Sequence, residues 1–416
     1  MPNTDIKSSP LREIIYKYPE VSPFVIIKID VQRRGVFYTD SALKQLDPNI
    51  HQTKDVGIFG PRDNKTVQAP ESLLLRDGTS IVVDSSSPEK NPYFVEFIDG
   101  RLVLTDSGEV IEEVEYWEKP EFYNEKTSSG IPMSRIATAR PQRLSLTPYS
   151  YCHFWDNGNG CRYCDIFSNV KAKKSEDKYG FKVRLDPRDI SETYKTALKE
   201  EGRFTTTCLT SGSNTHGKEA FDDEVNYYIE VLQAMGENFT AKKFPSQLVA
   251  TSFNEKQLRR LYEETGLLGY TSDIEVLDKD LFNWICPGKA EWVGFERWKQ
   301  NLYTAVDIFG KGHVNSGIVG GVELAQPNGF KTEADALKST LEGVEELARH
   351  GVTVVHTVWI PRPGSYFENM KIPSLDYYVN LAKGINDITE KYSLTVDSDD
   401  FRRCGNHPNS DLARLY

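Results

Sequence analysis

The sequence predicts an α/β protein with a parallel sheet, preceded by a smaller β-rich region. Two observations lead to this prediction. From residue 143 to residue 392, strand-like stretches rich in β-branched residues alternate with longer stretches of helical character. Before residue 125, strand-like stretches follow one another with few helical patterns between them. The alternation favours parallel strands with helices outside, in either a barrel or an open doubly wound sheet.

Residues 1–125 are expected to form a β-rich N-terminal domain or extension. After a loose tail and a short helix, the strand candidates are 24–31, 80–83, 93–98, 102–104 and 110–117. Asp99 and Gly100 tolerate positive φ, so this pair between two candidates is a strong hairpin signal. The polar residues that follow, including Gly130 and Pro132, predict a linker over 126–142.

Residues 143–392 predict six strand–helix units. The strands are expected at 143–149, 204–209, 247–252, 270–276, 314–319 and 352–360, and the helices at 187–201, 219–235, 255–265, 291–309, 332–350 and 374–392. Asp186 followed by Pro187 is a typical helix start, and Gly351 stands where a helix C-cap glycine is expected. Residues 393–416 remain as a C-terminal segment.

Composition and charge exclude several functional classes. The chain has 416 residues, of which 38% are hydrophobic, and a formal net charge of −11. This apolar content is enough for a packed core, and an acidic protein is a poor candidate for sequence-independent nucleic-acid binding. No run approaches the ~18 apolar residues of a membrane span, and the N-terminus lacks a signal-peptide pattern. We therefore expect a cytoplasmic protein without a membrane span or a nucleic-acid partner.

Three of the six cysteines gather in one short stretch after the first strand of the βα series. Cys152, Cys161 and Cys164 are spaced C-x8-C-x2-C. Thiolates are soft ligands for zinc, Cu(I) or iron–sulfur clusters. One interpretation is a zinc site with a distant fourth ligand, such as Cys208 or a histidine, and another is three free thiols. A third is a four-iron cluster, in which three thiolates leave one iron open to an external ligand.

The third interpretation gains support because Cys161-Arg162-Tyr163-Cys164 resembles the cluster motif of the radical S-adenosylmethionine superfamily. That motif is usually C-x3-C-x2-C with an aromatic residue before the third cysteine, so the first gap is longer here. The resemblance implies that Cys152, Cys161 and Cys164 hold three irons of a [4Fe–4S] cluster and that the fourth iron binds S-adenosylmethionine. It covers about residues 143–392 and implies a parallel (β/α)6 partial TIM-type barrel, with or without an extension.

Other segments at strand ends strengthen the resemblance. The run 316–323, Ser-Gly-Ile-Val-Gly-Gly-Val-Glu, is similar to a family element whose isoleucine packs on adenine, and a Gly-Ile-Val-Gly run is typical of biotin synthase, hydrogenase maturase and methylornithine synthase relatives. The implied cofactor-binding residues are Tyr163, Ser211, Gly212, Ser213, Glu275, Ile318, Val358 and Ile360. Without the resemblance, residues 211–213 could equally be a simple strand-to-helix turn.

The resemblance also implies a reaction. S-adenosylmethionine would be cleaved to a 5′-deoxyadenosyl radical that abstracts a hydrogen from a small-molecule or peptide substrate, leading to rearrangement, bond cleavage or group transfer. A flavodoxin or ferredoxin is the implied electron donor. Sulfur insertion and methyl or alkyl transfer are alternatives within the family, and a zinc-binding α/β protein is the alternative outside it.

Cys404 is a candidate catalytic residue, as a hydrogen-atom donor to a product radical. It lies in the polar run 404–407, just after the last βα unit, where the C-terminal segment could cover the barrel mouth. The alternative is a surface loop near a frayed terminus.

Overall fold

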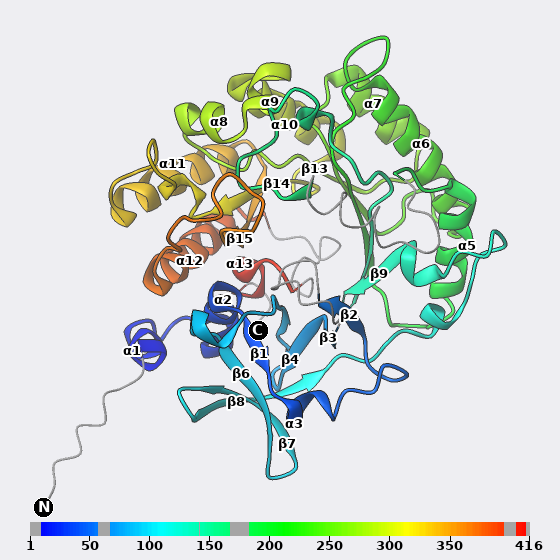
Figure 1. The fold of residues 1–416 in the computed structure, drawn as a ribbon. Coiled ribbons are helices and arrows are strands. Elements are labelled where there is room, and N and C mark those ends of the chain that lie inside the picture. Colours follow the sequence, from blue (N-terminus) through cyan, green and yellow to red (C-terminus); the bar gives the residue numbers. More distant parts are fainter. Residues whose placement is uncertain (1–9, 57–66, 141, 167–182, 395–404, 413–416) are drawn as a thin grey trace, which may run out of the picture.

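The computed structural model describes residues 10–56, 67–140, 142–166, 183–394 and 405–412. In this part of the chain two sheets carry most of the strands, and a continuous buried core joins the elements around them. Figure 1 shows the helices of the second part forming an arc around a curled sheet, with the N-terminal sheet on the side where the arc is open.

The larger sheet has seven strands in the order β15-β14-β13-β12-β11-β10-β9. Six of them are parallel and follow chain order: β10 (Arg143–Leu146), β11 (Thr206–Thr210), β12 (Ser246–Val249), β13 (Gly269–Thr271), β14 (Val314–Gly320) and β15 (Thr353–Val358). The expected α/β fold with a curled, mainly parallel sheet is therefore confirmed.

Helices connect these strands as the alternation predicts. The connecting helices are α5 (Pro187–Ala197), α6 (Asp222–Gly236), α7 (Glu255–Glu264), α8 (Lys279–Ile285), α9 (Pro287–Trp292), α10 (Phe295–Phe309) and α11 (Glu333–Arg349), and α12 (Leu375–Lys391) follows the last strand. Asp186 caps α5 by accepting a hydrogen bond from the Arg188 amide at 2.8 Å, with Pro187 in the first turn. The expected helix over 291–309 is divided, because Gly294 lies between α9 and α10 with a φ of +85°.

The expected linker over 126–142 contains a strand. β9 (Ala137–Arg140) pairs antiparallel with β10 and forms one edge of the larger sheet. Its side chains alternate between buried and partly buried, which is the pattern of a strand with one face on the core. The prediction of a linker was wrong for these residues, because four residues are too few for the pattern to stand out in the sequence.

The N-terminal part begins with two helices. α1 (Pro10–Lys17) agrees with the expected short helix, but α2 (Pro23–Arg34) occupies the stretch expected to be a strand at 24–31. Every residue from Val25 to Gln32 is buried, because α2 contacts β5, β15, α12 and α13 on several sides. A helix buried all round loses its amphipathic period, so its run of Val and Ile cannot be told from a buried strand.

A six-stranded sheet follows, in the order β1-β6-β7-β8-β4-β5. Its strands are β1 (Val36–Tyr38), β4 (Ser72–Leu75), β5 (Ser80–Val82), β6 (Tyr93–Ile98), β7 (Arg101–Asp106) and β8 (Glu109–Tyr116), with α3 (Asp40–Leu43) after β1 and a separate pair, β2 (Thr53–Val56) and β3 (Val67–Pro70). Asp99 and Gly100 have φ of +50° and +80° in the β6–β7 turn, so the hairpin signal was correct.

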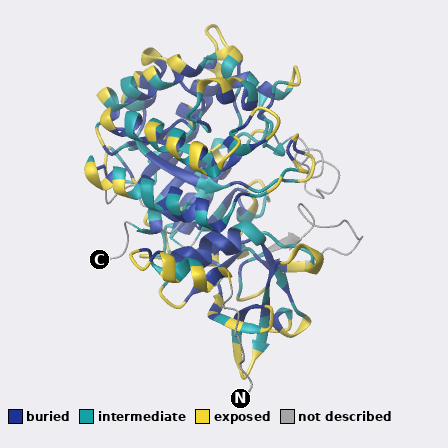
Figure 2. Cartoon of the chain, turned by 90° about the vertical axis from the view of Figure 1, so that its left-hand side faces the viewer, coloured by how far each residue is buried: buried dark blue, intermediate teal, exposed yellow. Residues whose placement is uncertain are grey.

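The C-terminal helix α13 (Pro408–Leu412) ties the two parts together. It packs on α2, α12 and β15, and Asp411 forms a fully buried ion pair with Lys28 of α2. Upstream of it, the Val82 amide of β5 donates to the Gly405 carbonyl at 3.1 Å. Figure 2 shows buried residues running without interruption from the N-terminal part into the larger sheet. Within the described residues, no helix has the length and hydropathy to cross a membrane.

Candidate functional site

The cysteine loop follows β10, at the carboxyl ends of the parallel strands. Its first part lies against the β11 loop: the His153 amide donates to the Ser213 carbonyl at 2.8 Å. A Cβ added to Gly212 would lie 2.2 Å from the Tyr151 carbonyl oxygen and 2.6 Å from the Cys152 Cβ. Gly212 therefore has a packing reason to be glycine, because it lets the cysteine loop cross the end of β11.

The second part of the loop lies against α8 and α9. The Arg162 amide donates to the Ile285 carbonyl at 2.8 Å, and its Nε donates to the Trp284 carbonyl at 2.7 Å. Cys161 is buried, while Cys152 and Cys164 are partly buried. Burial raises the pKa of the Cys152 thiol to about 11 and raises that of Cys164 further.

The donor chemistry of this loop fits an iron–sulfur cluster, although the thiols do not converge. The three thiols are close enough to influence one another's ionisation. Yet among the described residues no group of three or more Cys, His, Asp or Glu side chains is arranged to hold a metal ion. The thiol of Cys161 is instead hydrogen-bonded to Cys286. Soft thiolate donors on one short loop are the ligands that such a cluster takes, and metal binding deprotonates them.

Glu275 lies at the centre of a buried polar group beside this loop. Its Oε1 accepts from Lys289 Nζ at 2.7 Å, and the same ammonium donates to the Asp273 carbonyl at 2.5 Å. The hydroxyl of Tyr163 is also hydrogen-bonded to Glu275. Burial raises the pKa of Glu275, and Lys289 opposes this rise. Glu275 thus connects Tyr163 of the cysteine motif to α9.

Glu275 also has an unusual backbone conformation, with a φ of +72°. A non-glycine residue there costs about 1–3 kcal/mol and persists where the surroundings enforce it. Two backbone bonds to β14 do so: the Glu275 amide donates to the Gly317 carbonyl, and the Val319 amide donates to the Glu275 carbonyl, both at 3.0 Å. Such strain is typical of functional sites, and the proposed contact of Glu275 with the cofactor stays a prediction.

A cavity of about 310 Å³ opens beside the cysteine loop. Four residues expected in the site line it, namely Tyr163, Cys164, Val358 and Ile360. Val319 lines it as well, whereas Ile318 is buried at 3% exposure and is not among the lining residues. The structure therefore brings the ends of β14 and β15 to the third cysteine, and the contact of Ile318 with the cofactor stays a prediction.

The N-terminal part supplies another wall of this cavity. Gln32, Val82 and Asp84 line it, together with Asn406 of the C-terminal segment. Asp84 forms an ion pair with Arg362, which follows β15, and Arg362 Nη2 lies 3.0 Å from Asp84 Oδ2. These residues were missed, because nothing in the sequence signals which part of the N-terminal region packs on the larger sheet.

Ser211 and Ser213 make hydrogen bonds within the protein, and their contact with the cofactor stays a prediction. Ser211 Oγ accepts from the Tyr149 amide at 3.1 Å, and Ser213 Oγ accepts from Thr251 Oγ1 at 2.6 Å.

The buried carboxyl of Glu224 accepts from the Asn214 amide at 2.7 Å and from Thr251 Oγ1 at 3.0 Å. Burial raises the pKa of Glu224 to about 7. Glu224 was not predicted, since an acidic residue in the first turn of a helix looks like an ordinary cap.

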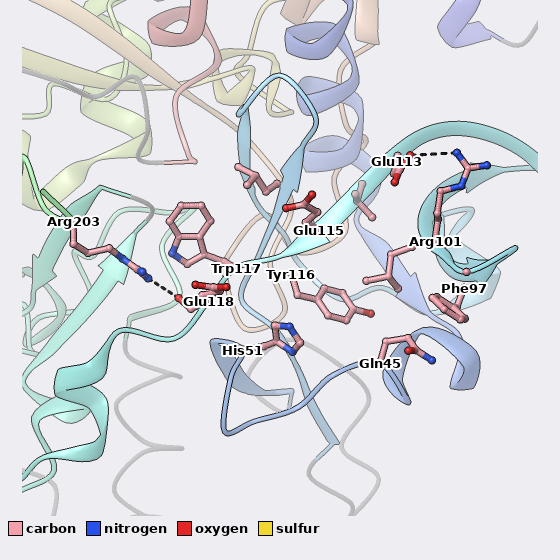
Figure 3. A pocket seen from close by; sticks show the side chains of 14 residues that line it. Gln45, His51, Phe97, Arg101, Glu113, Glu115, Tyr116, Trp117, Glu118 and Arg203 are labelled. Atoms are coloured by element: carbon pink, nitrogen blue, oxygen red, sulfur yellow. Dashed lines mark hydrogen bonds and ion pairs between the residues drawn. The ribbon is translucent and has the colours of Figure 1, made fainter. Parts of the chain in front are cut away.

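Two other features lie apart from this site. Cys404 falls outside the described residues, so its proposed role stays a prediction. A larger cavity of about 590 Å³ lies on the N-terminal sheet (Figure 3), where Arg203 Nη2 donates to the Glu118 carbonyl at 2.6 Å and the guanidinium stands over the Trp117 ring. None of its lining residues belongs to the cysteine loop.

The chain is similar to a curated relative and to solved structures that include radical S-adenosylmethionine enzymes. It is similar to bacteriochlorophyllide c C-7(1)-hydroxylase from Chlorobaculum limnaeum, with 27% identity over 286 residues. The similar region is 65% of this chain and 66% of the hydroxylase, just under two thirds of that protein's length. No protein-family model matches the chain.

Solved structures give weaker similarities. A radical SAM methyltransferase from Sphaerobacter thermophilus is 14% identical with a TM-score of 0.42, covering 76% of this chain and 80% of that one. The cobalamin-dependent S-adenosylmethionine radical enzyme OxsB is 13% identical with a TM-score of 0.33, covering 65% of this chain and 35% of that one.

Proposed function

We propose that this chain is a radical S-adenosylmethionine enzyme that abstracts a hydrogen from an organic substrate. Support comes chiefly from the placement of Cys152, Cys161 and Cys164 on the loop after the first parallel strand, next to a cavity at the carboxyl ends of β14 and β15. In this proposal the three cysteines hold a [4Fe–4S] cluster. When bound, the cluster supplies the electron that cleaves S-adenosylmethionine to a 5′-deoxyadenosyl radical.

The chain's own residues would position the reactants and exclude water. Tyr163, Glu275 and Lys289 hold the second half of the cysteine loop against α9. Val358 and Ile360 line one wall of the cavity, and Asp84 and Arg362 close the side where the N-terminal part meets β15. We assign to the N-terminal part the shielding of this cavity, because a radical must be kept from solvent.

The hydroxylase relative favours hydroxylation of a substrate carbon as the first outcome to examine. The substrate, a flavodoxin- or ferredoxin-type electron donor and a cytoplasmic location remain expectations. Sulfur insertion and methyl or alkyl transfer would use the same cofactor site, and the products of S-adenosylmethionine distinguish them.

The deciding experiment is anaerobic reconstitution with iron and sulfide, followed by mass spectrometry of the adenosine products under dithionite. We expect 5′-deoxyadenosine from the wild type and none from Cys164→Ala. Cys208→Ala is the matched control, because Cys208 is a buried thiol in β11 outside the motif. S-adenosylhomocysteine as the product would indicate methyl transfer. Methylthioadenosine would indicate aminocarboxypropyl transfer. A colourless protein with stoichiometric zinc would overturn the proposal.

A further inference from the structure

Cys286 lies directly opposite Cys161, although it is outside the cysteine motif. The Arg162 amide donates to the Ile285 carbonyl at 2.8 Å, and the Gly288 amide donates to the Asn159 carbonyl at 2.8 Å. Cys161 directly precedes Arg162 in the chain, and Cys286 directly follows Ile285. The second bond joins Asn159, two residues before Cys161, to Gly288, two residues after Cys286. The two bonds therefore flank Cys161 and Cys286 and place them next to each other, where the cysteine loop crosses the junction of α8 and α9.

The side chains follow the backbone. The thiols of Cys161 and Cys286 are hydrogen-bonded to each other, both are buried, and both are free thiols. A disulfide takes Cβ atoms about 3.5–4.5 Å apart, and two thiols in hydrogen-bond contact are neighbours from which such a bond can form.

The position of α9 beside Cys161 is fixed by contacts of Lys289. Its ammonium donates to Glu275 and to the Asp273 carbonyl and lies 4.7 Å from the centre of the Trp298 ring. Cys286, at the start of α9, is therefore held against the cysteine loop.

We propose that Cys161 and Cys286 form a disulfide when the protein carries no cluster and meets a peroxide. The sulfur of Cys161 attacks one oxygen of hydrogen peroxide, the O–O bond breaks, and the departing hydroxide takes the thiol proton to become water. The resulting sulfenic acid is attacked by the Cys286 thiol, the S–S bond forms, and the hydroxyl leaves with the thiol proton as a second water. Two thiols are oxidised by two electrons, and one peroxide is reduced to two waters.

The disulfide has a consequence that rests on the proposed function. Cys161 would be withheld from iron, so an oxidised chain could not assemble its cluster until a thiol reductant restored the two cysteines. The same bond would protect Cys161 from irreversible oxidation to the sulfinic acid.

The test uses the full chain, freed of metal and reduced under anaerobic conditions. It is then treated with one equivalent of hydrogen peroxide, alkylated and digested for mass spectrometry. We expect a cross-linked pair of peptides containing Cys161 and Cys286, with the loss of two alkylatable thiols per chain. The wild-type cross-link needs no variant, so the result does not depend on how a substitution folds.

Three variants sharpen the result. Cys286→Ser and Cys286→Ala should keep Cys161 out of this cross-link, and Cys208→Ser should behave as the wild type. Iron uptake by the peroxide-treated wild type should fall at least several-fold and return after dithiothreitol. Cross-links that join Cys161 only to Cys152 or Cys164, or no thiol loss, would overturn the proposal. Because the cross-link is measured without metal, a failure of S-adenosylmethionine cleavage leaves it unaffected.

Discussion

At the scale of single residues, the site depends on close approaches that only certain side chains allow. Gly212 lets Tyr151 and Cys152 pass over the end of β11, and Gly317 lets the Asp273 carboxylate accept its amide hydrogen at 2.7 Å. Glu275 is held in the left-handed region by β14. Each of these residues fixes the backbone that presents the cysteine loop, so substitutions at them test the site without removing a cysteine.

Gly212→Ala should displace the cysteine loop, because the new Cβ would lie 2.2 Å from the Tyr151 carbonyl oxygen. We expect iron content after reconstitution to fall several-fold while the overall helical circular dichroism is kept. Gly236→Ala is the matched control, since the nearest atom to its Cβ would be 3.5 Å away. Iron content equal to the wild type in Gly212→Ala would contradict this reading of the loop.

Glu224→Gln should change how stability depends on pH. The pKa of Glu224 rises from 4.5 to about 7 on folding, so ionising it opposes folding. The penalty is absent below about pH 4.5, grows as pH rises, and reaches about 3 kcal/mol above pH 7. Urea unfolding should show that the free energy of unfolding of the variant, relative to that of the wild type, increases between pH 5 and pH 8 by up to this amount. An unchanged difference between the two pH values would show that Glu224 is not buried as described.

At the scale of elements, the free edge of the larger sheet is covered by a side chain. β15 is the last strand, and Asn409 of α13 accepts from the His356 amide at 3.0 Å and donates to the Val354 carbonyl at 3.2 Å. The amide group of Asn409 thus stands where a neighbouring strand would otherwise pair. Through this contact and the Lys28–Asp411 ion pair, α13 holds the edge of the sheet against α2.

Asn409→Ala should leave the His356 amide and the Val354 carbonyl without these partners. A buried group left unpaired costs about 1–3 kcal/mol, so we expect a loss of stability of that order. Hydrogen exchange should quicken at the His356 amide of β15 and not in β12. The control is Asn386→Ala, since Asn386 bonds only to Glu390 one turn away on the exposed face of α12. Unchanged exchange at β15 would contradict the role of Asn409.

At the scale of the whole molecule, the N-terminal part and the larger sheet with its helices share one core. α2 buries eight consecutive residues among α12, α13, β5 and β15, and the cavity beside Cys164 has walls from both parts. The N-terminal part is therefore built into the fold, and α2 packs on the last strand of the larger sheet.

A chain that starts at residue 126 should fail to fold stably. It would expose the surfaces that α2 covers and leave Asp411 without Lys28, and each buried apolar side chain of α2 contributes about 1.5–3 kcal/mol. We expect insoluble protein, or protein that binds a hydrophobic dye and unfolds without cooperativity. A soluble truncated chain with a sharp thermal transition would show that the larger sheet and its helices fold alone.

The sequence by itself determined the order of the parallel strands and helices, the hairpin at Asp99-Gly100, and the position of the cysteine loop after the first parallel strand. These features have local causes: alternating strand and helix patterns, turn residues, and the spacing of thiols. They can be recognised because each one depends on neighbours within a few residues.

Only the tertiary structure decided that residues 24–31 are helical, that the N-terminal part lines the cavity, and that Cys286 faces Cys161. Burial on all sides removes the periodicity that would reveal a helix, and a contact between residues far apart in the chain leaves no local pattern. The spacing of Cys152, Cys161 and Cys164 could be recognised in the sequence. The contact between Cys161 and Cys286 depends on how α9 packs on the cysteine loop.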